Sequence, residues 1–201
     1  MKKIKLLVLL LTLSVLVWNC GSRSEEEEAK EEPTSGLDAI QKMAKEAEKM
    51  SKEGPKETVD PKLLKALLPE DADGLKRKEA SSEKNAMMGF GVSTAKASYR
   101  DDAGQDIDVN ITDVAGMGVA LMGMAAWSMA SIDKETEYGY EKTTEYQGYK
   151  AFEKYNTQSK NGEISVLVAD RYIVQVNGNN VSIDKIKAVL SDIDLDKLKD
   201  L

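Results

Sequence analysis

The chain has 201 residues and a formal net charge of −7, with 41% apolar and 31% charged residues. This length and apolar content suit one packed domain with a tail. The chain has no histidine, which removes the usual general base near neutral pH and the commonest metal ligand. Its net negative charge does not favour binding to DNA or RNA, which requires a basic surface. Its single cysteine excludes an internal disulfide.

Residues 1–19 have the organisation of a secretory signal peptide. Lys2, Lys3 and Lys5 form a positive start, and residues 6–18 are apolar apart from Thr12 and Ser14. A stretch of 13 residues is too short to cross a bilayer core, which needs about 20. We therefore predict that residues 1–19 are a targeting segment and do not belong to the fold.

Cys20 stands directly after this segment, in "LVWNCGS". The arrangement resembles the lipobox of bacterial lipoproteins, in which the cysteine becomes the first residue of the mature chain and carries acyl groups. Val17 takes the place of the usual leucine, and Trp18-Asn19 depart from the small residues of that family, as in the relaxed boxes of spirochaetes and some Bacteroidota. The alternative is a secreted protein with a chance cysteine near its cleavage site.

The lipobox resemblance implies a palmitate-carrying membrane protein of the bacterial cell envelope, held by acyl groups on Cys20. Ser22 stands where an aspartate would favour retention in the inner membrane of enterobacteria. The resemblance therefore favours the outer membrane, on its periplasmic or surface face, over the inner membrane.

Residues 20–36 are predicted to form an acidic disordered linker. The segment from Gly21 to Gly36 holds six glutamates and no apolar residue larger than alanine, so charge repulsion keeps it extended. It is either a solvated spacer or a sorting label, because acidic residues after the lipidated cysteine resemble the surface-export signals of Bacteroidota lipoproteins.

Two helices are predicted before the main domain's strands. Apolar residues at spacings of three and four indicate an amphipathic helix within residues 37–58, ended by Gly54-Pro55. The apolar stripe of this helix is narrow. The helix could therefore serve as a spacer, form a weak coiled coil or cover the domain as a lid. Asp60 and Pro61 are typical of the N-cap and first position of a second, short helix.

Residues 59–201 are predicted to form an α+β globular domain. Strand patterns occupy 75–82 and 85–100, and residues 101–105 form a turn before an alternating strand at 106–111. Two strands joined near Gln147-Gly148, turns at 159–162 and 177–180, and a helix capped by Ser182 complete the pattern. Between those turns lie either two strands or one long strand bent near 169–171. We expect an antiparallel sheet with helices packed on one face.

Residues 114–132 form a run of 19 uncharged residues. The run is rich in Ala, Gly and Met, which partition into lipid less strongly than Leu, Ile or Phe. We predict a buried helix of the domain whose methionines fill irregular gaps. Insertion into a membrane and a Met-rich ligand groove are the alternatives.

The candidate ligand-binding residues are Tyr138, Tyr140 and Tyr149, which lie on one predicted hairpin and could stack a sugar or a peptide. Amphipathic packing at a sheet edge is the alternative for them. The aspartates at 101–108 lack the spacing of an EF-hand, so no metal site is predicted, and no catalytic residue or cofactor is assigned.

These patterns favour a non-catalytic, lipid-anchored envelope protein whose domain binds a small ligand or another envelope protein. A Ser-His-Asp triad is impossible without histidine, and the chain has no phosphate-binding loop or GxSxG elbow. A structural or assembly lipoprotein that acts only through protein contacts is the first alternative. A membrane-active protein that inserts residues 114–132 is the second.

Overall fold

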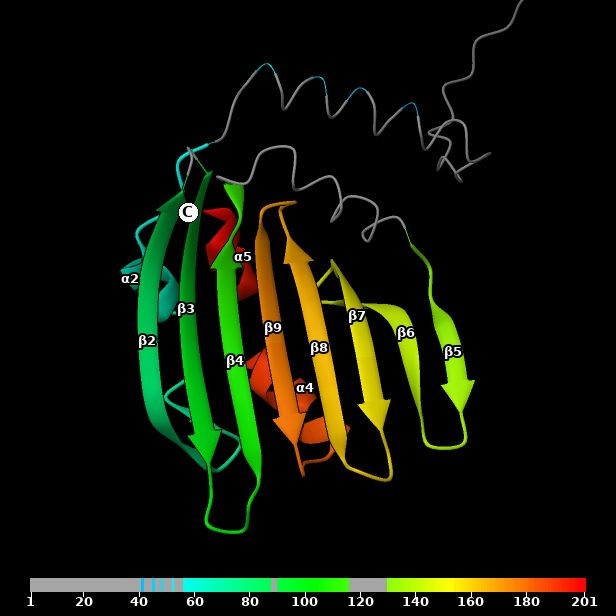
Figure 1. Ribbon diagram of the computed structural model, residues 1–201. Helices are drawn as coiled ribbons and strands as arrows, with labels where there is room; N and C mark the ends of the chain where they lie inside the picture. The colour runs from blue at the N-terminus through cyan, green and yellow to red at the C-terminus, as the bar shows by residue number, and fades with distance from the viewer. Residues whose placement is uncertain are drawn as a thin grey trace, which may run out of the picture. The chain divides into compact units, whose positions relative to one another are not determined.

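The computed structural model describes residues 56–87, 90–115 and 130–201, together with the single positions 41, 45, 48 and 52 (Figure 1). These four positions are helical, in line with the amphipathic helix predicted within 37–58. The predicted signal peptide, Cys20 and the acidic linker lie outside the described residues. So does most of the run 114–132, and the buried helix there stays a prediction.

A nine-stranded antiparallel sheet organises the described part of the chain. Its strands are β1 (Asp71–Ala72), β2 (Leu75–Met87), β3 (Phe90–Arg100), β4 (Asp106–Asp113), β5 (Asp133–Thr136), β6 (Gly139–Tyr146), β7 (Tyr149–Asn156), β8 (Asn161–Val168) and β9 (Tyr172–Asn179). In space they follow the order β1-β2-β3-β4-β9-β8-β7-β6-β5. Two meanders thus meet where β4 pairs with β9, and β5 lies at the far edge. The predicted antiparallel sheet is confirmed.

Alternation along the strands gives the sheet one apolar face and one polar face. In β4, Ile107, Val109 and Ile111 are buried, whereas the residues between them are only half-buried. The same alternation runs along β9, its partner in the middle of the sheet. Because successive side chains point to opposite faces, the apolar residues of the central strands gather on one side.

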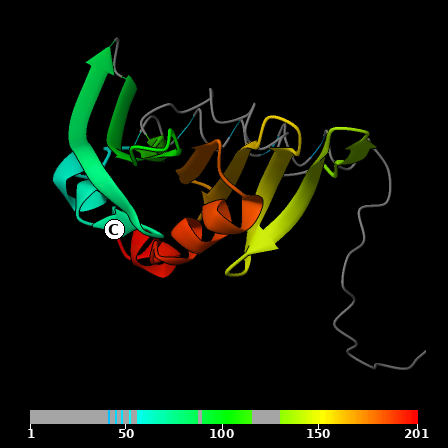
Figure 2. The ribbon, with the colours of Figure 1, turned by 90° about the horizontal axis from the view of Figure 1, so that it is seen from below.

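Within residues 56–87, 90–115 and 130–201, three short helices cover the apolar face (Figure 2). They are α2 (Pro61–Lys65), α4 (Ile183–Ser191) and α5 (Leu195–Lys199). We call this side of the sheet the helix face and the opposite side the open face. Each helix is capped by a side chain that accepts a hydrogen bond from a backbone N–H of its first turn. The capping residues are Asp60, Ser182 and Asp194. The predicted caps at Asp60 and Ser182 are therefore confirmed, although the helical share of the described chain is smaller than predicted.

Several strand boundaries differ from the prediction. The turn predicted at 177–180 is wrong for residues 177–179, because β9 continues through Asn179. The turn predicted at 159–162 occupies 157–160 instead, and Asn161-Gly162 begins β8. The two strands predicted on either side of Gln147-Gly148 are correct, but a third strand, β5, precedes them and pairs with β6.

The misplaced turns share one cause, which is close packing of α4 on the sheet. A Cβ atom built on Gly178 would lie 2.4 Å from Val181 Cγ2 and 2.6 Å from Ile186 Cδ1. One built on Gly162 would lie 2.6 Å from Tyr155 Cδ2 and 2.9 Å from Ile186 Cδ1. These glycines therefore make room for a helix side chain and do not mark turns.

Gly178→Ala is expected to lower the free energy of unfolding by about 1–3 kcal/mol, because the added methyl group overpacks the contacts with Val181 and Ile186. Urea unfolding measures the change. Gly91→Ala is the matched control, since its new Cβ would meet Thr58 Oγ1 at an ordinary 3.6 Å. Equal stability of the two variants would contradict close packing at Gly178.

The edge strand β5 carries charge on Asp133, Lys134 and Glu135. In an antiparallel pairing of two copies, facing residues point to the same side. A two-fold pairing of β5 with itself would therefore set Lys134 opposite Lys134, or Glu135 opposite Glu135. Like charges in facing positions are destabilising, so we expect β5 to remain the outermost strand.

Candidate functional site

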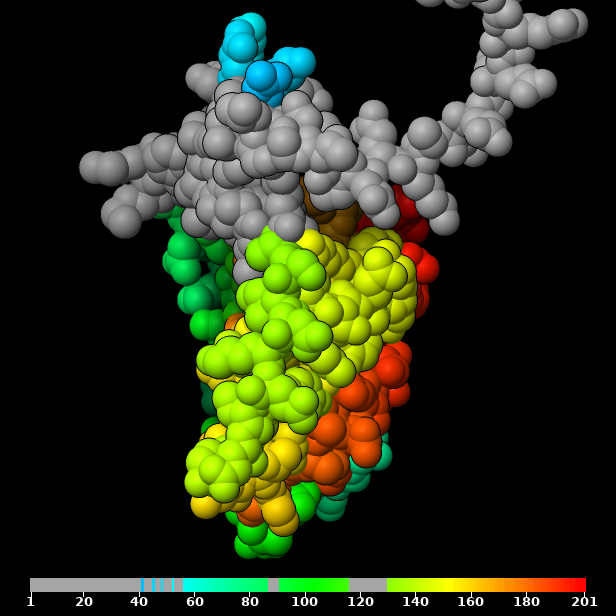
Figure 3. All heavy atoms as spheres, turned by 90° about the vertical axis from the view of Figure 1, so that its right-hand side faces the viewer, coloured from blue at the N-terminus to red at the C-terminus, as the bar shows by residue number. Residues whose placement is uncertain are grey.

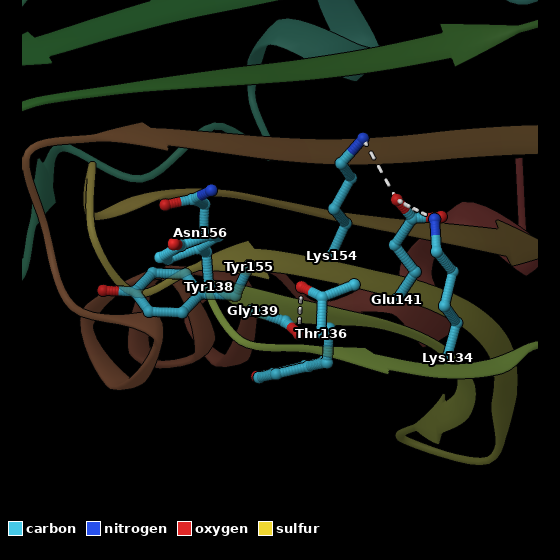
Figure 4. A pocket seen from close by; sticks show the side chains of 9 residues that line it. Lys134, Thr136, Tyr138, Gly139, Glu141, Lys154, Tyr155 and Asn156 are labelled. Atoms are coloured by element: carbon cyan, nitrogen blue, oxygen red, sulfur yellow. Dashed lines mark hydrogen bonds and ion pairs between the residues drawn. The ribbon is translucent and has the colours of Figure 1, made fainter.

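An open pocket lies on the edge of the sheet formed by β5, β6 and β7, the edge that faces the viewer in Figure 3. It has about 300 Å³ of empty space, part of which is open to solvent, so it is a shallow hollow in the surface. Figure 4 shows its lining, which comes from three adjacent strands and one turn: Lys134, Thr136, Tyr138, Gly139, Tyr140, Glu141, Lys154, Tyr155 and Asn156.

Tyr138 occupies the two-residue turn between β5 and β6. Thr136 pairs with Gly139 across this turn, and the Tyr138 carbonyl accepts a hydrogen bond from Thr157 N at 2.8 Å. Gly139 has a φ of 155°, and a Cβ there would collide with the Tyr155 carbonyl oxygen on β7. Only glycine fits this close approach, so the backbone fixes the position of the tyrosine beside it.

The three tyrosines predicted to bind a ligand lie in different environments. Tyr138 is 49% exposed at the pocket rim. Tyr140 also lines the pocket, but its hydroxyl donates to Glu153. Tyr149 lies outside the pocket lining, and its hydroxyl donates to Asp196 Oδ1 of α5 at 2.8 Å. The structure thus brings two of the three to the pocket, and one of them, Tyr138, is half-exposed there.

Three charged side chains form a row across the pocket on the open face. Glu141 lies between two lysines, 3.6 Å from Lys134 Nζ and 3.4 Å from Lys154 Nζ. The lysine side chains are 59% and 56% exposed, whereas that of Glu141 is 30% exposed. Their ammonium groups therefore keep donors that point to solvent. Such a row can hold a ligand with hydrogen bonds and charge.

A second carboxylate, Glu153, lies on the helix face of β7 and is only 1% exposed. It accepts hydrogen bonds from the hydroxyls of Tyr140 and Tyr146 on β6. Lys142 Nζ lies 3.6 Å and Lys187 Nζ of α4 lies 3.4 Å from its Oε1. This tyrosine–carboxylate cluster ties β6, β7 and α4 together behind the pocket.

The cluster shifts the pKa values of its members in opposite directions. Burial acts to raise the pKa of Glu153, but the hydrogen bonds from Tyr140 and Tyr146 and the two lysine charges outweigh burial and lower it. Burial, followed by the hydrogen bond to Glu153, raises the pKa of both tyrosines. The cluster is therefore held as one carboxylate with two neutral phenols.

Sequence reasoning missed the charged row and the cluster. A usable signal existed in "KETEYGYEK": once the turn is set at Tyr138, Lys134 and Glu141 become facing residues. The position of Lys154 needs the next pairing, with Glu141 opposite it. In the described ranges, no group of three Cys, Asp or Glu side chains gathers in a way that could hold a metal ion.

No family model, curated protein or solved structure matches this chain. Over the residues that the structure describes, none of the helices combines the length and apolarity needed to cross a bilayer.

Proposed function

We propose that this chain is a lipid-anchored protein of the bacterial cell envelope whose sheet domain binds a small ligand or partner and catalyses no reaction. The signal-type segment 1–19 and Cys20 support the anchor. The observation that carries the binding role is the half-exposed Tyr138 in a pocket beside two solvent-facing lysines, Lys134 and Lys154.

The acyl groups on Cys20 would hold the chain at the outer membrane, on its periplasmic or surface face. Two or more acyl chains give stable anchoring, because each buried methylene contributes about 0.8 kcal/mol. The predicted linker after Cys20 has 16 residues, from Gly21 to Gly36. Fully extended, they reach no more than about 58 Å, so the pocket can meet ligands away from the lipid surface.

A binding role without catalysis fits the state of the carboxylates at this edge. Glu153 is closed off and receives both tyrosine hydroxyls, so it has no free oxygen to offer a reacting group. Glu141 is ion-paired on both sides, so its carboxylate is already engaged with two lysines. With no histidine in the chain, these residues are better suited to holding a ligand than to transferring protons.

Cys20→Ala is expected to release the protein from the membrane fraction and to abolish incorporation of labelled palmitate, because the thiol is the acylation point. Ser24→Ala, in the same linker, is the control and should remain in the membrane fraction. Fractionation and metabolic labelling of the producing bacterium measure both effects. Unchanged membrane partition of Cys20→Ala would sink the anchor proposal.

A further inference from the structure

The groups that line the edge pocket have more positive than negative charge. Lys134 and Lys154 both contact the single carboxylate Glu141, which leaves one positive charge in excess. The chain as a whole has a net charge of −7. This excess belongs to the pocket lining, since Glu163 of β8 faces Lys154 from its other side. It favours an anionic group small enough to contact both lysines directly.

The pocket also offers an apolar surface beside those charges. Tyr138 is 49% exposed, and its ring is shown beside Asn156 at one end of the pocket, with the lysines at the other (Figure 4). Tyrosine presents a rigid, amphipathic face at low entropic cost. A flat aliphatic ring face can stack on it while polar substituents reach the charged row.

We propose that this pocket binds a saccharide whose pyranose ring carries a carboxylate. The ring stacks on Tyr138, and the carboxylate accepts hydrogen bonds from the ammonium groups of Lys134 and Lys154. The hollow is shallow and its lining comes from one strand edge, which suits a single ring lying on the surface rather than a folded partner. This inference rests on the proposed binding function and specifies its ligand class.

The test uses the full-length protein in detergent micelles and a tetramer of galacturonic acid as the probe. Its methyl ester is the matched neutral probe, with the same rings and no carboxylate. Calorimetry gives the dissociation constants, and amide chemical shifts of Tyr138, Glu141 and Lys154 locate the site. The dissociation constant of the acid is expected to be at least about tenfold lower than that of the ester, because one charge-assisted hydrogen bond contributes about that much affinity.

Variants separate the site from general charge attraction. Tyr138→Ala and Lys154→Gln are each expected to weaken binding of the acid about tenfold. Lys96→Gln is the control, because Lys96 is exposed and β3 carries it well away from β5 in the strand order. An equal loss in Lys96→Gln and Lys154→Gln would overturn the inference in favour of non-specific attraction.

The two proposals fail in different ways. Equal binding of acid and ester, lost in Tyr138→Ala, overturns the acidic ligand and leaves the binding function in place. If neither probe shifts these amides, and a panel of neutral sugars, amino acids and short peptides shifts none of them, the pocket is not a ligand site. That result overturns the binding function and the ligand class together.

Discussion

Replacing Arg171 with methionine is expected to lower the free energy of unfolding by about 3–5 kcal/mol, because the change leaves a buried carboxylate without its partner. Asp113, at the end of β4, is fully buried. Arg171 donates to it twice, from Nε to Oδ1 at 2.9 Å and from Nη2 to Oδ2 at 2.7 Å. Methionine keeps an unbranched chain of similar length and removes both donors.

The same carboxylate holds the segment by which the chain enters the domain. Asp113 accepts hydrogen bonds from Val59 N at 2.8 Å and Ala115 N at 3.0 Å. The Val59 carbonyl in turn accepts from Ser93 Oγ at 2.6 Å. Under the lipid-anchor proposal, any pull on the linker reaches the sheet at this junction. We therefore expect the Val59 amide to exchange with solvent faster in Arg171→Met than in the wild type.

Urea unfolding and amide hydrogen exchange measure these two effects. Arg77→Met is the matched control: its partner Glu70 lies 2.5 Å away but is 85% exposed, so losing the pair should cost about 0–1 kcal/mol. Adding Asp113→Asn to Arg171→Met removes the orphaned charge and should recover part of the loss. A loss in Arg171→Met no larger than in Arg77→Met would contradict a buried, dependent Asp113.

Much of the central fold could be predicted from sequence because local signals and burial agree there. The alternation of Ile107, Val109 and Ile111 with polar residues set the faces of β4 correctly. The turn at 101–105 and the cap at Ser182 were also readable, since each depends on residues close together in the chain. These features need no knowledge of which strand lies beside which.

Features that depend on distant contacts could not be predicted. Gly162 and Gly178 carry the composition of turns, yet both are strand residues, because Ile186 of α4 packs against them. The sheet order, with β5 at the edge and β9 beside β4, depends on pairings between strands that lie far apart in the sequence. The short charged strand β5 has little strand propensity and was missed for that reason.

In the candidate site too, features set by nearby residues could be predicted, whereas features set by distant contacts could not. Tyr138 was found as a tyrosine near a turn, but its exposure follows from Gly139 and the neighbouring strand β7. Tyr149 looked equivalent in the sequence, yet it contacts α5, which lies far along the chain. Glu153 resembled the surface glutamates of an acidic protein, and its burial depends on α4 covering the helix face.

Glu153→Gln is expected to lower the free energy of unfolding at pH 7 by about 1.5–3 kcal/mol, the typical contribution of a hydrogen bond to a buried charge. Glutamine has nearly the same shape but carries no charge for Lys142 and Lys187. Glu141→Gln is the matched control, because Glu141 also lies between two lysines at 3.6 and 3.4 Å, yet is 30% exposed and forms no tyrosine pair. Its loss should be about 0–1 kcal/mol.

The pH dependence distinguishes loss of charge from loss of shape. The pKa of Glu153 in the folded protein lies below its ordinary value of 4.5, so its ionised form contributes stability that is fully present above that pH. This contribution disappears as the pH falls through the folded-state pKa. The stability difference between wild type and Glu153→Gln should therefore be largest near neutral pH and shrink below pH 4.5, because protonated Glu153 resembles glutamine. Urea unfolding at pH 7, 5, 4 and 3 measures it, and a difference that stays constant over this range would show that charge is not what Glu153 contributes.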